Sequence, residues 1–133
     1  MAEFNTYNSN DANLATGGLI VTGLVEGDAI ECGQNEEFFT TTVGLQGDVV
    51  DNESNNQTGY FKVKLLATSP WCAILEKRAR EGSYDSYQVI DLNTGGINAS
   101  CTRGRVKKTA DKKWGKEVSE REYEIAAQDY KTA

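Results

Sequence analysis

The stretch from Gly59 to Gly82, GYFKVKLLATSPWCAILEKRAREG, constrains the fold most, because it begins as a strand and ends as a helix. Polar and apolar residues alternate from Tyr60 to Leu65, which is the period of a strand with one packed face. Ser69 then offers an N-cap hydroxyl, and Pro70 takes a first-turn position that needs no amide donor. Gly82 suits the left-handed backbone found after a helix end. The pattern predicts a strand leading directly into a helix.

The faces of this helix are indicated by its spacing. Apolar side chains and one arginine stem recur on one side, while the charged residues between them are expected to stay in water. The predicted packed positions are Trp71, Ile74, Leu75 and Arg78, and the predicted solvated ones are Glu76, Lys77, Arg80 and Glu81. Because no other stretch reads convincingly as a helix, we expect it to flank a sheet built from the rest of the chain.

The first half of the chain consists of short apolar runs separated by turn residues. This spacing predicts a meander of short antiparallel strands from Ala12 onward. Residues 1–11 are polar and rich in asparagine, so we expect a flexible N-terminal arm, and Asp51 to Thr58 is expected to be a polar loop. The turn candidates are Gly17-Gly18, Gly27-Asp28, Gly33-Gln34 and Gly47-Asp48.

The second half predicts a hairpin, a basic loop and a last strand. Tyr84 to Leu92 and Ile97 to Val106 read as two strands around the turn Asn93 to Gly96. Lys107 to Lys116 has no periodicity and reads as an exposed basic loop, with its tryptophan either exposed or folded back on the sheet. For Glu117 to Ala127 we prefer a strand to a helix, which places Glu120, Glu122 and Glu124 together on one face as a continuous acidic ridge.

Several kinds of active site are excluded by residue types. Without histidine, the chain can form no Ser-His or Cys-His pair and no histidine metal site. Cys32, Cys72 and Cys101 are far apart and contain no C-x-x-C pair, so we interpret them as structural or incidental. No pair of carboxylates is distinguished as a glycosidase pair would be. We predict no catalytic, metal or cofactor site.

Length and composition indicate one domain over residues 1–133. The N-terminal sequence MAEFNTYNSND lacks the basic-then-apolar order of a signal peptide, and no apolar run approaches a membrane span. We therefore expect a protein made in the cytoplasm, with no membrane partner.

The charge distribution is more informative than the net charge of −6. Residues 1–59 carry ten acidic side chains and no lysine or arginine, so the two parts of the chain carry −10 and +4. Half of the basic residues fall between Arg103 and Lys116. Such a split suits head-to-tail binding between copies of one chain. The alternative is two solvated faces that only keep a monomer soluble.

With these residues laid out, the chain resembles the tail tube proteins of contractile-tailed bacteriophages. Three segments carry the resemblance through their order and spacing: YNSNDANLATGGLIVTGLVEGDAI, EEFFTTTVGLQGDVV and NNQTGYFKVKLLATSP. The likeness covers roughly residues 7–127, and the basic stretch Lys107 to Lys116, Cys72 and Cys101 depart from it. It implies a mainly β fold, an antiparallel β-sandwich or barrel with one flanking α-helix.

The resemblance also implies a function, in which six copies close into a ring and rings stack into a hollow tube inside a sheath. The implied partners are other copies of the chain, the sheath protein, and the tape-measure protein and genomic DNA that pass through the lumen without specific binding. The implied location is the virion tail. An acidic lumen would repel phosphates, so DNA would slide without sticking.

Two sets of residues are candidates for these roles. The candidate inter-subunit contacts are Arg103, Arg105, Lys107, Lys108, Lys112, Lys113 and Trp114. The candidate lumenal acids are Glu26, Asp28, Glu31, Asp48, Asp51, Glu120, Glu122 and Glu124. Two other functions stay open: a nucleic-acid-binding β module that uses the same basic residues, and a related ring-forming tail part such as a terminator or baseplate protein.

Overall fold

The computed structural model describes residues 4–132 and is mainly antiparallel β, as predicted. Within that range, one α-helix, α1 (Pro70–Glu81), and one short 3-10 helix (Ser9–Asp11) accompany ten strands. The strands are β1 (Ala12–Thr16), β2 (Leu19–Ile20), β3 (Ile30–Gln34), β4 (Phe39–Val43), β5 (Val49–Glu53), β6 (Gly59–Leu66), β7 (Asp85–Asp91), β8 (Ala99–Val106), β9 (Glu120–Ala127) and β10 (Lys131–Thr132).

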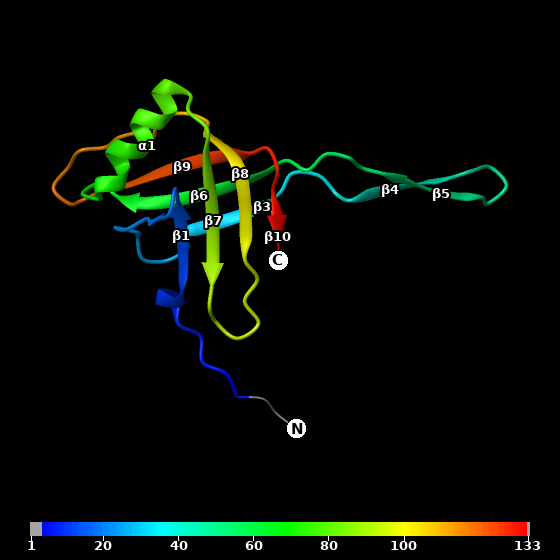
Figure 1. Cartoon of the computed structure of the whole chain (residues 1–133), viewed down its shortest axis with the longest axis horizontal. Coiled ribbons are helices and arrows are strands. Elements are labelled where there is room, and N and C mark those ends of the chain that lie inside the picture. Colours follow the sequence, from blue (N-terminus) through cyan, green and yellow to red (C-terminus); the bar gives the residue numbers. More distant parts are fainter. Residues whose placement is uncertain (1–3, 133) are drawn as a thin grey trace.

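Eight strands form one sheet in the order β2-β1-β7-β8-β9-β6-β3, with β10 paired to β8. β8 changes neighbours along its length, since Ala99 and Ser100 pair with β10 while Gly104 to Val106 pair with β9. The sheet folds over on itself there. As a result, β1 and β7 run across β6 and β9 as a second layer, and α1 lies at one end of the two layers (Figure 1).

The helix begins and ends as predicted. The hydroxyl of Ser69 accepts a hydrogen bond from the amide of Trp71 and donates one to the carbonyl of Thr22, at 3.3 and 2.6 Å. Pro70 occupies the first turn, where no amide donor is needed. Gly82 closes the helix with φ 66°, a left-handed conformation that costs glycine little. The junction of β6 and α1 is therefore fixed by local chemistry.

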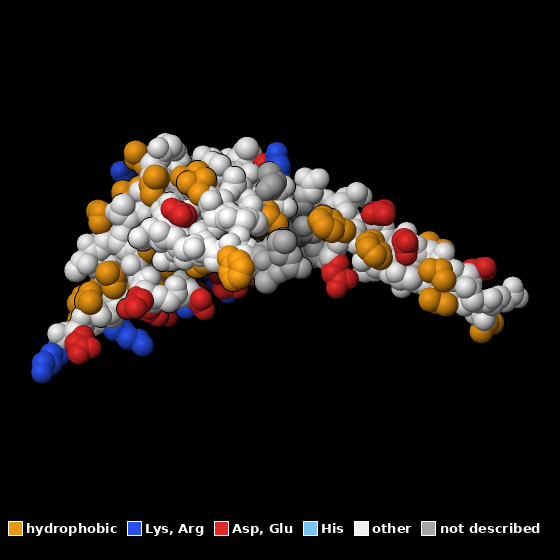
Figure 2. Space-filling view, turned by 90° about the horizontal axis from the view of Figure 1, so that it is seen from below, with side chains coloured by type: hydrophobic (Ala, Val, Ile, Leu, Met, Phe, Trp, Pro, Cys, Tyr) orange, Lys and Arg blue, Asp and Glu red, His pale blue; other side chains and the backbone are white. Residues whose placement is uncertain are grey.

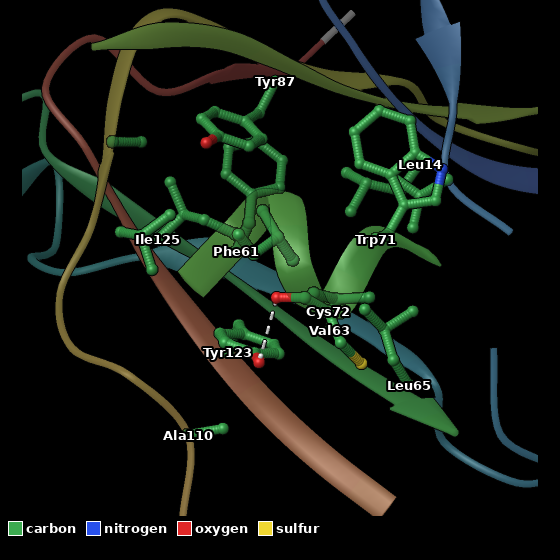
Figure 3. Packing of buried hydrophobic residues seen from close by; sticks show 14 of the residues in the cluster. Leu14, Phe61, Val63, Leu65, Trp71, Cys72, Tyr87, Ala110, Tyr123 and Ile125 are labelled. Atoms are coloured by element: carbon green, nitrogen blue, oxygen red, sulfur yellow. Dashed lines mark hydrogen bonds between the residues drawn. The ribbon is translucent and has the colours of Figure 1, made fainter. Parts of the chain in front are cut away.

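The core lies between the two layers. Leu14 of β1 and Tyr87 of β7 point toward Phe61 of β6 and Ile125 of β9, and Trp71 of α1 is packed among them (Figure 3). The inward residues of β6 alternate with outward ones, as the sequence predicts. The helix was predicted less well, because Ile74 is 38% exposed and its place in the packed stripe is taken by Cys72.

The prediction of a meander in the first half is correct for two hairpins and wrong for the other strand pairings. β1 and β2 do form a hairpin around Gly17 and Gly18, which both have positive φ. β4 and β5 form a second hairpin, but β1 pairs on its other side with β7, and β3 pairs with β6, so these strands do not follow the order of a meander. Periodicity reports the two faces of a strand but not its neighbours, so these pairings were not predictable from it.

Smaller expectations about loops also need correction. Gly33 and Gln34 lie inside β3 and not in a turn, and the predicted loop from Asp51 to Thr58 begins with the last three residues of β5. Of the predicted flexible arm, residues 1–3 lie outside the described range. Asn8 exchanges two hydrogen bonds with Asn93, of 2.9 and 3.1 Å, so this part of the N-terminal segment is held against the β7–β8 loop.

Candidate assembly surfaces

Residues 35–58 form an arm that projects from the side of the body (Figure 1). Its strands, β4 and β5, pair only with each other. The turn at its tip contains Gly47 with φ 88°, as predicted for Gly47-Asp48. An isolated two-stranded hairpin is marginally stable in water at best. We therefore expect the arm to be stabilised by contact with a partner surface.

The two faces of the arm differ in chemistry. Directly paired residues share a face, so Phe39 lies with Glu53, Thr41 with Asp51, and Val43 with Val49. We call this set of six residues the acidic face of the arm. The opposite face carries mainly Thr40, Thr42 and Asn52, with Val50 as its apolar member. The acidic face thus combines apolar side chains with two carboxylates.

The exposed apolar area of the arm is unusual for a soluble monomer. Phe38 is 74%, Val43 65% and Leu45 104% exposed, and in Figure 2 apolar and acidic side chains alternate along the arm. Residues 35–58 contain five acids and no lysine or arginine. Apolar patches of this kind mark interaction sites. The expected partner of the arm is consequently a surface with both apolar and cationic groups.

The basic loop between β8 and β9 is exposed, as predicted, and Trp114 is 81% exposed and does not fold back on the sheet. Two of its lysines form ion pairs with acidic residues of the same chain. Lys107 pairs with Glu124 at 3.3 Å, and Lys112 pairs with Glu76 at 2.9 Å. Lys108 and Lys113 line a cleft of about 620 Å³ together with Asp111, Glu120, Glu122 and Glu124. The structure thus brings candidate contacts and candidate lumenal acids together in one cleft.

Glu76 anchors the basic loop, although the sequence predicted that it stays in water. One of its carboxylate oxygens accepts hydrogen bonds from Tyr123 Oη at 2.8 Å, Lys112 Nζ at 2.9 Å and the amide of Ala110 at 3.3 Å. Partial burial by itself would raise the pKa of Glu76, but the bonds from Lys112 and Tyr123 outweigh it and lower that pKa. Burial, and then the bond to Glu76, raise the pKa of Tyr123. The acid therefore stays charged in the folded state.

We expect Glu76→Gln to lower the free energy of unfolding at pH 7 by about 1–3 kcal/mol, because it weakens charge-assisted hydrogen bonds at a largely covered site. Since the pKa of Glu76 is lowered on folding, its stabilisation is complete above its ordinary value of 4.5 and is lost as the pH falls through the lowered folded value. Urea unfolding across this range should show the difference from wild type shrinking in acid. The exposed Glu81→Gln is the control, and a difference independent of pH would contradict this role.

Arg103 and Arg105 lie apart from the cleft and contact Tyr84 instead. The guanidinium carbon of Arg103 is 4.1 Å from the centre of the Tyr84 ring, and that of Arg105 is 5.8 Å away. Tyr84 is 41% exposed. We call these three residues the Tyr84 platform. The sequence named both arginines but missed the tyrosine, because nothing in its spacing links residue 84 to residues 103 and 105.

The candidate lumenal acids lie in three places. Glu31, Glu122 and Glu124 lie on the outer face of the β3-β6-β9 part of the sheet, where they alternate with lysines: Glu31 and Glu124 flank Lys62, and Glu122 is opposite Lys64. Glu120 continues this face, and Glu26 and Asp28 lie in the loop before β3. Asp48 and Asp51 are on the arm. The predicted continuous acidic ridge is therefore a face of mixed charge.

Among residues 4–132 no group of three or more suitable side chains is placed to hold a metal ion. In the same range, no helix has both the length and the apolar character needed to cross a membrane.

Comparison with known proteins identifies the fold. No protein-family model and no curated protein matches the chain. Among solved structures, a chain of the anti-feeding prophage tube-terminating cap matches with TM-score 0.65 and 8% identity, over 100% of this chain and 94% of that one. A chain of the sheath/tube terminator of the extracellular contractile injection system PVC matches with TM-score 0.64 and 8% identity, over 99% of both.

A chain of the PVC sheath-tube complex in the extended state matches with TM-score 0.62 and 6% identity, over 96% of this chain and 91% of that one. The protein thus has the fold of chains found in the tubes and terminators of contractile injection systems. This confirms the resemblance drawn from the sequence at the level of the fold.

Proposed function

We propose that the protein is a self-assembling structural subunit of a contractile tail, in which its single domain forms hexameric rings that stack into the inner tube. The observation that carries this proposal is the arm, a two-stranded hairpin with exposed apolar residues on both faces and no strand partner among the described residues. The likeness to contractile-system chains over nearly the whole length supports it.

The tube would be enclosed by a sheath, with the tape-measure protein and then DNA in its lumen. A sheath is named in two of the similar structures. For the lumenal wall we favour the outer face of β3, β6 and β9, since it gathers Glu31, Glu120, Glu122 and Glu124 on regular strands. Lysines alternate with these acids, so the wall would resist strong adhesion of phosphates without being uniformly acidic.

A ring-forming terminator is the second candidate, because two of the similar structures are terminators. A terminator would bind copies of itself within one ring and stop there. A nucleic-acid-binding module is less well supported, since Lys107 and Lys112 are engaged in ion pairs within the chain. Neither candidate requires a catalytic group, and we propose no enzymatic activity.

We expect the purified protein at high concentration to form hollow rings or tubes, visible by negative-stain electron microscopy. Open-ended tubes indicate a tube subunit, and single rings of uniform height indicate a terminator. A cryo-EM map would then identify the strands that line the bore. Sedimentation as a monomer at all concentrations and salt conditions would refute self-assembly.

A further inference from the structure

The geometry points to one specific contact between copies: the acidic face of the arm of one copy binds the Tyr84 platform of a second copy. This inference rests on the proposed function, because it assigns residues to a contact that a self-assembling subunit needs. The inference is narrower than the charge split, since it selects two of the six candidate cations and two of the ten acids in residues 1–59.

The platform is held in place before any partner binds. Arg103 stacks on the ring of Tyr84, and its backbone amide donates to Asp129 at 3.1 Å. Arg105 Nη2 lies where a side chain at Gly82 would be, 2.7 Å from an added Cβ, so the guanidinium sits at the C-terminal end of α1. A cation is favoured there by the helix dipole. Binding would therefore cost these two side chains little conformational entropy.

Among the described residues, the two arginines of the platform also have no ion-pair partner. Among residues 4–132 the ion pairs involve Arg78, Lys107 and Lys112, so neither platform arginine has a carboxylate within 4.0 Å. Planar guanidinium groups form bidentate bonds with carboxylates, which lysine cannot do. The half-exposed ring of Tyr84 adds an apolar surface. This combination is absent from the basic loop, whose lysines lie beside acids of their own chain.

The acidic face of the arm supplies the complement. Asp51 accepts a hydrogen bond from Thr41 at 3.1 Å, which orients its carboxylate next to the apolar residues of the same face. No cation on the arm competes for it. The arm extends away from the α1–β7 junction that carries Tyr84 (Figure 1), so the two surfaces meet between copies. Because they are different surfaces, the contact is head to tail and can propagate.

Charge exchange tests this pairing. The variants are Arg103→Glu with Arg105→Glu, Asp51→Arg with Glu53→Arg, and all four changes together. Lys77→Glu with Lys116→Glu makes the same change of charge at two exposed positions outside both surfaces and is the control. Sedimentation equilibrium measures pairwise association, and electron microscopy scores rings and tubes separately. Circular dichroism checks folding, and neutral Gln and Asn replacements substitute for any reversal that unfolds the protein.

Each double reversal on the arm or platform is expected to weaken association about 100-fold or more, and the combined variant is expected to recover most of it. The control should remain close to wild type. Wild-type association in either double variant, or no recovery in the combined one, overturns the contact. Pairs without rings or tubes would refute the proposed function and leave the contact standing, whereas wild type without any association refutes both.

Discussion

Replacing Phe39, Val43 and Val49 with serine is expected to leave the protein folded and monomeric. These side chains lie on the acidic face of the arm and are 50–65% exposed in the single chain. If a partner covers them, their loss removes about 5 kcal/mol of apolar burial, which is roughly a thousandfold or more in affinity. The body should be unaffected, because β4 and β5 contribute no strand to its sheet.

Sedimentation velocity measures the loss of assembly, and thermal unfolding checks the body. Thr40→Ala with Val50→Ser alters the opposite face of the arm and serves as the matched control. Normal tubes from the triple variant would show that the arm is not an assembly element. Equal loss in both variants would show instead that the whole arm is enclosed, with no preference for the acidic face.

Trp71→Ala is expected to lower the free energy of unfolding by about 3–5 kcal/mol, as a large-to-small change in a packed core. Trp71 is 6% exposed and lies against the guanidinium of Arg78, whose carbon is 5.9 Å from the ring centre. Arg78 in turn donates to Thr16 at 2.7 Å and pairs with Asp85 at 3.2 Å. The cavity would therefore also loosen a link between α1, β1 and β7.

The control for this variant is Ile74→Ala on the same helix, since Ile74 is 38% exposed and should cost well under half as much. Urea denaturation of both variants measures the difference. Similar costs at the two positions would mean that α1 packs through a different face. That outcome would also support the sequence-based prediction that Ile74 is a packed position of the helix.

The sequence was sufficient to predict the features that depend on interactions between residues close together in the chain. Ser69, Pro70 and Gly82 set the helix through capping and backbone preferences, and the alternation in β6 follows from side-chain period. The strand Glu120–Ala127 was also predicted, about three residues too early at its start. Each of these features depends on residues within a few positions of one another.

What the sequence could not provide was contact between distant residues. In the sequence, Glu76 cannot be distinguished from an exposed acidic residue of a helix. Its contacts with Tyr123 and Lys112 form only when the chain folds. The acidic ridge was predicted correctly as one face of β9, but the lysines of β6 that alternate with it depend on strand pairing. The projection of the arm from the body could not be predicted either, because its alternating residues fit a strand inside the body as well as one outside it.

The strand order has a consequence for when the chain can fold. β6 lies between β3 and β9, and β1 reaches its partner β7 more than 70 residues later, so neither β1 nor β6 has both of its neighbours until residues 85–127 have been made. Closing such long loops is slow, and folding rates fall as contacts become less local. A growing chain on the ribosome therefore cannot form this core early. Folding of the core is expected once β9 has been made, on a scale of milliseconds to seconds, and the proposed contacts between copies would form afterwards.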